Sequence, residues 1–266
     1  MTAPVDGHRS GFACFVGRPN AGKSTLTNAL VGSKVAITSE KPQTTRHTIR
    51  GIVHRKDAQL IIVDTPGLHR PRTLLGQRLN DLVRETWSQV DVVGFCVPAD
   101  QQAGPGDRFI AAELAKLAAR TPVIGILTKT DLVSAQRIAE RLLELQGLMD
   151  FAELVPVSAT QDYQLDTLAD LLVARLPQGP LLYPDGELTD EPEATLVAEL
   201  VREAALDGVR EELPHSIAVT VEEMAPRAGR DDLVDIYVHL FVERPSQKAI
   251  VLGHKGERLK KIGSTA

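Results

Sequence analysis

The sequence predicts an α/β domain with a mostly parallel six-stranded sheet and helices on both faces, followed by a smaller α+β domain. Short apolar or β-branched runs alternate with longer amphipathic segments over residues 11–176, which is the pattern of strand–helix units. A stretch rich in proline and glycine then interrupts this pattern. The length of 266 residues also exceeds the roughly 100–200 residues of a typical domain, so two domains are expected.

Six segments of the larger domain have the apolar, β-branched character of strands, and amphipathic segments lie between them. Strands are expected over Phe12–Val16, Ile49–His54, Leu60–Val63, Val92–Val97, Val123–Leu127 and Leu154–Val157. Helices are expected over Ser24–Val31, Leu74–Val83, Asp107–Ala118, Ala135–Leu145 and Leu165–Leu176.

The linker between the domains is expected at residues 177–192, PQGPLLYPDGELTDEP. Four prolines and two glycines in these sixteen residues are incompatible with the apolar periodicity of a helix or a strand. Residues 1–10 are expected to be a flexible N-terminus, residues 11–176 the larger domain and residues 193–266 the smaller one. In the smaller domain we expect a charged helix over Glu193–Glu212 and strands over Ile217–Glu223 and Leu233–Val242, with a turn at Gly229–Asp232.

Composition excludes several classes of protein. Cys14 and Cys96 lie inside apolar runs rather than in metal-ligand spacing, so buried free thiols are expected and a disulfide framework is not. No apolar run reaches 18 residues and the first ten residues carry no apolar segment, which predicts neither a spanning helix nor a secretory signal. We therefore expect a cytoplasmic protein, whose net charge of −5 argues against a surface that is basic throughout. A monomer is also expected.

A phosphate-binding motif of the form GxxxxGK[ST] stands between the first expected strand and the first expected helix, as GRPNAGKS over Gly17–Ser24. Backbone N–H groups of such a loop surround the phosphates, Lys23 reaches the β- and γ-phosphates, and Ser24 ligates Mg²⁺. The expected nucleotide-binding residues of this loop are Gly17, Arg18, Pro19, Asn20, Ala21, Gly22, Lys23, Ser24 and Thr25.

A second motif, DTPG, follows the buried strand at residues 60–63 and delivers Asp64 to the same edge of the sheet. Asp64 is predicted to support Mg²⁺, and the N–H of Gly67 to contact a γ-phosphate. Between the two motifs, residues 33–48 are polar and aperiodic, so we expect a loop in which Thr44 or Thr45 completes Mg²⁺ coordination only in the triphosphate state. The nucleotide-binding residues expected after the strand are Asp64, Thr65, Pro66, Gly67 and Leu68.

The base-recognition residues follow the strand at 123–127 as Thr128-Lys129-Thr130-Asp131. The carboxylate of Asp131 accepts hydrogen bonds from guanine N1–H and its exocyclic amine, whereas adenine offers neither in that arrangement. Thr128 stands where such motifs generally carry asparagine, so we expect weaker base binding or looser bracing of the phosphate loop. Ser158 and Ala159 are predicted to close the base site, the Ala159 N–H contacting guanine O6.

The last 23 residues are basic although the chain as a whole is acidic, because they contain six lysine and arginine residues and only one acidic residue, Glu257. Gly253-His254-Lys255-Gly256 forms a GxxG loop, whose glycines permit close approach to a ribose-phosphate chain. A solvent-facing lysine-rich helix is the alternative. The expected RNA-binding residues are Lys248, Gly253, His254, Lys255, Gly256, Arg258, Lys260 and Lys261, beside a groove for bases made by Ile250, Val251, Leu252, Leu259 and Ile262.

These residues go beyond generic nucleotide-binding motifs. QTTRHTIRGI at 43–52, VDTPGLHRP at 63–71 and the motif spacing resemble the bacterial Era GTPases, and SQKAIVLGHKGERLKKIG at 246–263 resembles the KH RNA-binding motif. The resemblance implies a Ras-like P-loop NTPase domain with a type II KH domain. It also implies a closing strand after the GxxG helix, so we expect a KH domain that is incomplete at Ala266 and impaired in RNA binding.

By resemblance, the expected activity is GTP hydrolysis that controls assembly and maturation of the small ribosomal subunit, with the KH domain holding the 3′ end of its rRNA. The expected cofactors are GTP or GDP, Mg²⁺ and K⁺, and peripheral association with the inner face of the cell membrane is implied. Leu68 occupies the position where small signalling GTPases carry a glutamine, so slow intrinsic turnover is implied, with Asn20 helping to hold the potassium ion. The expected catalytic residues are Asn20, Lys23, Thr45 and Gly67, and the expected metal ligands are Ser24, Thr45 and Asp64.

Two alternatives stay open on the residues alone. One is an ATP-using P-loop phosphotransferase, which Asp131 disfavours. The other is a non-catalytic RNA-binding scaffold that uses bound GDP only for folding.

Overall fold

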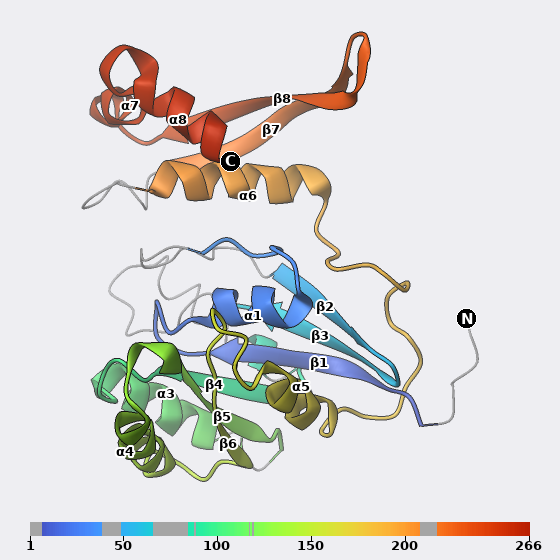
Figure 1. Ribbon diagram of the computed structural model, residues 1–266, viewed down its shortest axis with the longest axis vertical. Coiled ribbons are helices and arrows are strands. Elements are labelled where there is room, and N and C mark those ends of the chain that lie inside the picture. The colour runs from blue at the N-terminus through green and yellow to red at the C-terminus, as the bar shows by residue number, and fades with distance from the viewer. Residues whose placement is uncertain are drawn as a thin grey trace. The chain divides into compact units, whose positions relative to one another are not determined.

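The computed structural model describes residues 7–38, 49–65, 85–87, 89–116, 118, 120–207 and 217–266. The chain divides into two compact units, shown in Figure 1. The first contains the described residues up to Ala36 and from Ile49 to Asp190, and the second contains Glu191–Ala266 with Ile37 and Thr38. The predicted segment Leu74–Val83 lies outside the described residues.

The first unit is built on a six-stranded sheet of order β2-β3-β1-β4-β5-β6. Only the β2–β3 pair is antiparallel, and the other neighbours are parallel. This topology confirms the predicted fold class. The strands are β1 (Arg9–Val16), β2 (Ile49–Arg55), β3 (Ala58–Asp64), β4 (Val92–Pro98), β5 (Val123–Thr128) and β6 (Glu153–Pro156). The helices are α1 (Lys23–Val31), α3 (Pro105–Ala115), the 3-10 turn η1 (Thr130–Leu132), α4 (Ala135–Gln146) and α5 (Leu165–Val173).

Helices cover both faces of the sheet, because the alternating residues of each strand bury apolar side chains on both sides. Phe15 of β1 packs in one core cluster with Leu26 of α1 and Leu168 of α5. Its neighbour Val16 packs in the other cluster, with Ile110 of α3 among others. Cys14 and Cys96 are free and buried as predicted, and burial raises the pKa of the Cys96 thiol to about 12.

Residues 177–192, where the linker between domains is expected, form hydrogen bonds with strands of the sheet. The buried side chain of Gln59 accepts hydrogen bonds from Leu182 N and Tyr183 N, at 2.7 and 2.9 Å, and donates to Tyr183 O. Ile52 N donates to Leu188 O, so the segment also covers the outer edge of β2. Proline prevents regular structure here, but the remaining backbone groups pair with strands, and the break between units falls after Asp190.

In its described residues, 37–38, 191–207 and 217–266, the second unit combines three α-helices with a two-stranded antiparallel hairpin. Its elements are α6 (Glu193–Leu206), β7 (Ile217–Arg227), β8 (Arg230–Val242), α7 (Pro245–Leu252), the 3-10 turn η3 (His254–Gly256) and α8 (Glu257–Thr265). Ala205, Ile217, Val251 and Ile262 form its core. Thr38 joins this unit because its N and Oγ1 both donate to Glu203 Oε1 of α6, at 2.8 and 3.0 Å.

Two expectations for this unit differ from the structure. Helix α6 ends at Leu206, while the expected end at Glu212 lies outside the described residues. Val251 and Ile262 are 4% and 3% exposed, so they belong to the core rather than to a groove for bases. Ile250, Leu252 and Leu259 remain exposed. Within the described ranges, no helix has the length and apolar character needed to cross a membrane.

Candidate functional site

The phosphate loop lies where the order of strands reverses direction in the sheet. β1 has β3 on one side and β4 on the other, and the loop joins the carboxyl end of β1 to α1, which is where open α/β sheets bind ligands. A Cβ at Gly17 would lie 2.5 Å from Cys96 O, and Gly22 has a φ of 86°. Asn20 is also left-handed, with a φ of 64°, a conformation that asparagine tolerates better than most residues. The glycines of the motif are therefore required by the loop's path.

Lys23 is enclosed by the carbonyl groups of its own loop. Its Nζ donates to Arg18 O at 3.1 Å and to Gly17 O at 3.4 Å. Burial lowers the pKa of this ammonium from its usual 10.5, and the nearby Asp64 carboxylate partly opposes that shift. The ammonium lies at the loop where phosphate oxygens are expected, and those oxygens would replace the carbonyl partners.

Two predicted metal ligands meet at the end of β3. Phe15 of β1 is in register with Asp64 of β3, and Ser24 Oγ donates to Asp64 Oδ2 at 2.7 Å. Thr65 Oγ1 donates to Phe15 O at 3.1 Å, which fixes the start of the DTPG segment. Hydroxyl and carboxylate oxygens are the donors that Mg²⁺ prefers, so this pair fits the ion.

Part of the predicted site cannot be placed. The predicted residues Thr44, Thr45, Pro66, Gly67 and Leu68 lie outside the described residues. Among the residues that are described, no cluster of three or more histidine, cysteine, aspartate or glutamate side chains forms a separate metal site.

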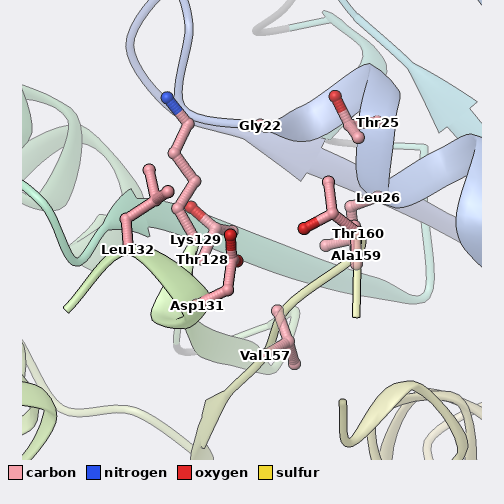
Figure 2. Close-up of a pocket in the computed structure, with 10 residues that line it drawn as sticks. All are labelled: Gly22, Thr25, Leu26, Thr128, Lys129, Asp131, Leu132, Val157, Ala159 and Thr160. Atoms are coloured by element: carbon pink, nitrogen blue, oxygen red, sulfur yellow. The ribbon is translucent and has the colours of Figure 1, made fainter. Parts of the chain in front are cut away.

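A cavity of about 210 Å³ lies beside the phosphate loop, at the ends of β5 and β6. Figure 2 shows residues of the phosphate loop and α1 on one side of it, and residues that follow β5 and β6 on the other. Its lining is Gly22, Thr25, Leu26, Thr128, Lys129, Asp131, Leu132, Val157, Ala159 and Thr160. The two segments predicted to recognise the base are therefore brought together in one pocket.

Asp131 is held in place by the segment predicted to close the base site. Ser158 Oγ donates to Asp131 Oδ1 at 2.5 Å and lies 3.2 Å from Thr160 Oγ1, while Gln161 N donates to Ser158 Oγ. Ser158 is buried, whereas Asp131 is exposed in the pocket wall. Ser158 thus orients the carboxylate, while Ala159 lines the pocket beside it.

Thr128 braces the phosphate loop directly. Its buried Oγ1 donates to Ala21 O at 2.7 Å, and Val97 O lies 3.4 Å away. The end of β5 therefore lies close enough to the loop for a hydroxyl to reach it. That this shorter side chain gives weaker base binding or looser bracing than an asparagine stays a prediction. Lys129 follows in a left-handed conformation, and Thr130 is buried.

The GxxG loop of the second unit has the backbone that its glycines predict. Gly253, Lys255 and Gly256 have φ values of 69°, 49° and 82°. A Cβ at Gly253 would lie 2.7 Å from the Cβ of Arg258, whereas nothing lies within 4 Å of one at Gly256. The exposed residues around this turn are Lys248, His254, Lys255, Lys260 and Lys261.

Arg258 has a different role from the other basic residues of the patch. Its Nη2 donates to Ala205 O at 3.2 Å and to Asp207 O at 2.9 Å, so the guanidinium caps the carbonyl end of α6. Lys261 Nζ lies 3.7 Å from Asp207 Oδ2. Since Nη2 is engaged by these backbone carbonyls, Arg258 has a structural contact that the predicted RNA contact did not include, and the RNA contact itself stays a prediction. No residue near Arg258 in the sequence indicates this partner, which lies 51 residues away.

Sequence reasoning also missed Leu132 and Thr160, which line the pocket immediately beyond the predicted motifs. Their adjacency to Asp131 and Ala159 was the available signal.

Comparison with known proteins agrees with this geometry. Residues 12–129 match the family described as 50S ribosome-binding GTPase, and residues 212–266 match the KH domain family. The GTPase Era of Streptomyces coelicolor is 66% identical over 264 residues, covering 96% of this chain and 83% of that protein. The GTPase Era of Mycolicibacterium smegmatis is 65% identical over 259 residues, covering 97% and 87% respectively.

Solved structures give the same result for the whole fold. A crystal structure of Era with MgGDPNP and nucleotides 1506–1542 of 16S ribosomal RNA has a TM-score of 0.91 at 35% identity, covering 97% of this chain and 87% of that one. An Aquifex aeolicus Era variant bound to GDP and AlF4⁻ has a TM-score of 0.90 at 35% identity, with the same coverage.

Proposed function

The chain belongs to the Era family of GTPases, as its motifs indicated, and on this premise we propose that GTP in its first unit controls binding of the 3′ end of small-subunit rRNA by its KH unit. This activity would serve assembly and maturation of the small ribosomal subunit. The crystal structure of an Era protein with nucleotides 1506–1542 of 16S ribosomal RNA supports the choice of RNA.

One observation carries the nucleotide assignment: Asp131 lies in the wall of a pocket beside the phosphate loop, with Ser158 bound to its carboxylate. Ser158 occupies one lone pair of Oδ1, and the carboxylate keeps acceptors for the two N–H groups on the guanine edge. Adenine would leave those acceptors unpaired, which disfavours the ATP-using alternative. Competition of labelled GTP with unlabelled ATP tests this choice, and equal competition by the two nucleotides would contradict it.

For hydrolysis, the chain supplies positioning and charge. Lys23 would exchange the carbonyls of Gly17 and Arg18 for phosphate oxygens, and Ser24 and Asp64 would hold Mg²⁺. When bound, that ion neutralises charge that develops on the phosphate oxygens. Leu68 cannot orient an attacking water as a glutamine does, so slow intrinsic turnover is proposed. Single-turnover hydrolysis separates a switch from a scaffold that only holds GDP.

We propose that Asn20 contributes its amide oxygen to a potassium ion beside the phosphates. Its exposure and its place in the loop, three residues before Lys23, support this role. Because its φ is 64°, Asn20→Ala would add backbone strain to any loss of ligation. Asn20→Gly tolerates the same backbone conformation but removes the amide oxygen, whereas Asn20→Asp retains a side-chain oxygen. Comparing the two variants therefore tests the role of the oxygen as an ion ligand. We expect Asn20→Gly to lose the preference for potassium over sodium, and equal turnover of the parental chain in both salts would contradict the role.

Coupling of the nucleotide to the KH unit is proposed through the loop at residues 33–48. Its residue Thr38 donates twice to Glu203 of α6. If GTP orders this loop, removing that acceptor should weaken the nucleotide dependence of RNA binding without removing RNA binding itself. Glu203→Ala, measured with GDP and with a non-hydrolysable GTP analogue, tests the link.

Three further proposals are a monomeric state, a cytoplasmic location, which the composition favours, and peripheral membrane association, which the family resemblance implies. Sedimentation velocity tests the first. Fractionation of cells, with and without a high-salt wash of the membranes, tests the other two.

A further inference from the structure

We propose that Arg18 is a positioning residue, which holds the phosphate loop in its nucleotide-binding form by anchoring it to the first turn of α3. The inference rests on the proposed GTP-binding function. Arg18 would act through the loop's backbone rather than by contact with the nucleotide.

The guanidinium of Arg18 binds two side chains from outside the phosphate loop. Its Nε donates to Asp107 Oδ1 at 2.8 Å, and its Nη2 donates to Gln101 Oε1 at 3.3 Å. Asp107 is fully buried, and its second oxygen accepts Gly104 N at 2.8 Å. Both carboxylate oxygens are thus engaged, one by the backbone before α3 and one by the phosphate loop.

The glycine at position 106 makes room for this contact. A Cβ at Gly106 would lie 2.8 Å from Cδ of Arg18 and 3.2 Å from its Cγ. The aliphatic part of Arg18 therefore lies directly on the first turn of α3. The anchor has both an ionic and a packing component.

The backbone of Arg18 is the part of the loop that this anchor controls. Arg18 O accepts Ala21 N at 3.2 Å, which closes the turn of the loop, and it accepts Lys23 Nζ at 3.1 Å. Fixing Arg18 thus fixes the carbonyl that holds the ammonium when phosphates are absent. A loop ordered in advance loses less conformational freedom when the nucleotide binds.

Removing Arg18 alone would leave the buried charge of Asp107 without its cation, a change that destabilises the fold itself. The informative variant is therefore Arg18→Gln with Asp107→Asn, which removes both charges and keeps similar volumes. Its control is Arg55→Gln with Asp166→Asn, which removes a 2.7 Å ion pair of the same unit away from the phosphate loop. All chains are assayed at full length for binding of GDP and of guanosine, with thermal unfolding of the nucleotide-free chains measured in parallel.

We expect the Arg18–Asp107 variant to bind GDP about tenfold more weakly, because one or two groups of the phosphate loop become mobile and must be ordered when GDP binds. Its affinity for guanosine, which carries no phosphate, should stay unchanged. The control variant should bind both ligands as the parental chain does. Equal weakening of GDP and guanosine binding would assign Arg18 a structural role only, and unchanged GDP binding would also overturn the inference. If the parental chain itself failed to bind GDP, the proposed function would fall together with the inference, so the two failures are distinguishable.

Discussion

The nucleotide edge of the first unit and the GxxG surface of the second both place glycine-rich turns next to an expected phosphate ligand, but they position their side chains differently. In the first unit, buried hydroxyl groups hold the functional groups by hydrogen bonds, as Ser158 does for Asp131 and Thr128 for Ala21. In the second, the candidate RNA-binding lysines are exposed, and left-handed backbone at Gly253 and Gly256 sets the shape of the turn.

This difference separates the two kinds of recognition. Guanine is distinguished by directed hydrogen bonds, for which small displacements are costly. An RNA backbone is held largely by charge, for which long mobile side chains suffice and salt competes. We therefore expect substitutions at the nucleotide edge to change ligand identity, and substitutions on the GxxG surface to change affinity and its dependence on salt.

The largest effect is expected for Asp131→Asn. The amide presents one donor to the N–H groups of guanine, so GDP affinity should fall at least about 100-fold. Xanthine carries a carbonyl where guanine carries its amine, so xanthosine diphosphate should bind the variant better than GDP does. Isothermal titration with both nucleotides measures this exchange. Ser158→Ala, which keeps the carboxylate but loses its orienting donor, should cost only about three- to tenfold.

A smaller effect is expected on the RNA side for Gly253→Ala. The added Cβ would meet the backbone and Cβ of Arg258, at a residue with a φ of 69°, so the turn must change shape. RNA affinity should fall about tenfold or more, given strain of about 1–3 kcal/mol at such positions. Gly256→Ala, which meets open space, is the matched control and should lose less. Fluorescence anisotropy with labelled RNA measures both, and equal losses would contradict this account of the turn.

Two substitutions, Lys255→Ala and Lys261→Ala, test how far lysine charge on the GxxG surface contributes to RNA affinity. Lys255 is exposed on the turn itself, whereas Lys261 lies 3.7 Å from the Asp207 carboxylate. Lys255→Ala should lower the slope of log affinity against log salt by about one, as for loss of one phosphate contact. Lys261→Ala should lower it less. RNA titrations at several salt concentrations decide, and an unchanged slope for Lys255→Ala would remove this residue from the interface.

A few-fold effect is expected at Thr128. Thr128→Val keeps the shape but removes the hydroxyl that donates to Ala21 O, so GDP should dissociate about fivefold faster. Thr128→Asn keeps a donor with a longer reach toward the base and should raise GDP affinity slightly. Release of a fluorescent GDP analogue measures both variants. Parental kinetics in Thr128→Val would show that the bond to Ala21 does not brace the loop.

The smallest effect concerns Lys23 and pH. Burial lowers its pKa in the folded chain below the usual 10.5, so the unfolded state binds more protons at this group in the alkaline range between the two values. Unfolding free energy of the nucleotide-free chain should therefore gain a contribution as pH rises through that range. Denaturant titrations against pH test the sign, and Lys23→Met should lack this contribution.

The parts predictable from sequence were those with local signals. Strand β1, which precedes the phosphate motif, and its neighbours in the sheet, β3 and β4, are continuous apolar runs. All three form where they are expected. The motif spacing also placed Ser24 and Asp64 together, because parallel strands deliver their carboxyl ends to one edge of the sheet.

What the sequence did not predict depends on partners far along the chain. Gln59 donates a hydrogen bond to Tyr183, which lies 124 residues further along the chain. Because of such contacts, the proline-rich stretch around Tyr183 is part of the first unit. The charge of Arg258 and its place beside the GxxG loop predict an RNA contact, but its Nη2 donates to two carbonyl groups at the end of α6. Val251 and Ile250 are equally apolar neighbours, and only the packing of α7 decides that Val251 is buried.

GTP control of RNA binding is tested most directly by the affinity of the chain for an RNA fragment that ends in the 3′ terminus of small-subunit rRNA, measured with GDP and with a non-hydrolysable GTP analogue. At one fixed salt concentration, we expect the two affinities to differ about fivefold or more, with tighter binding in the triphosphate state. Equal affinity in both states would contradict a GTP-controlled RNA-binding function.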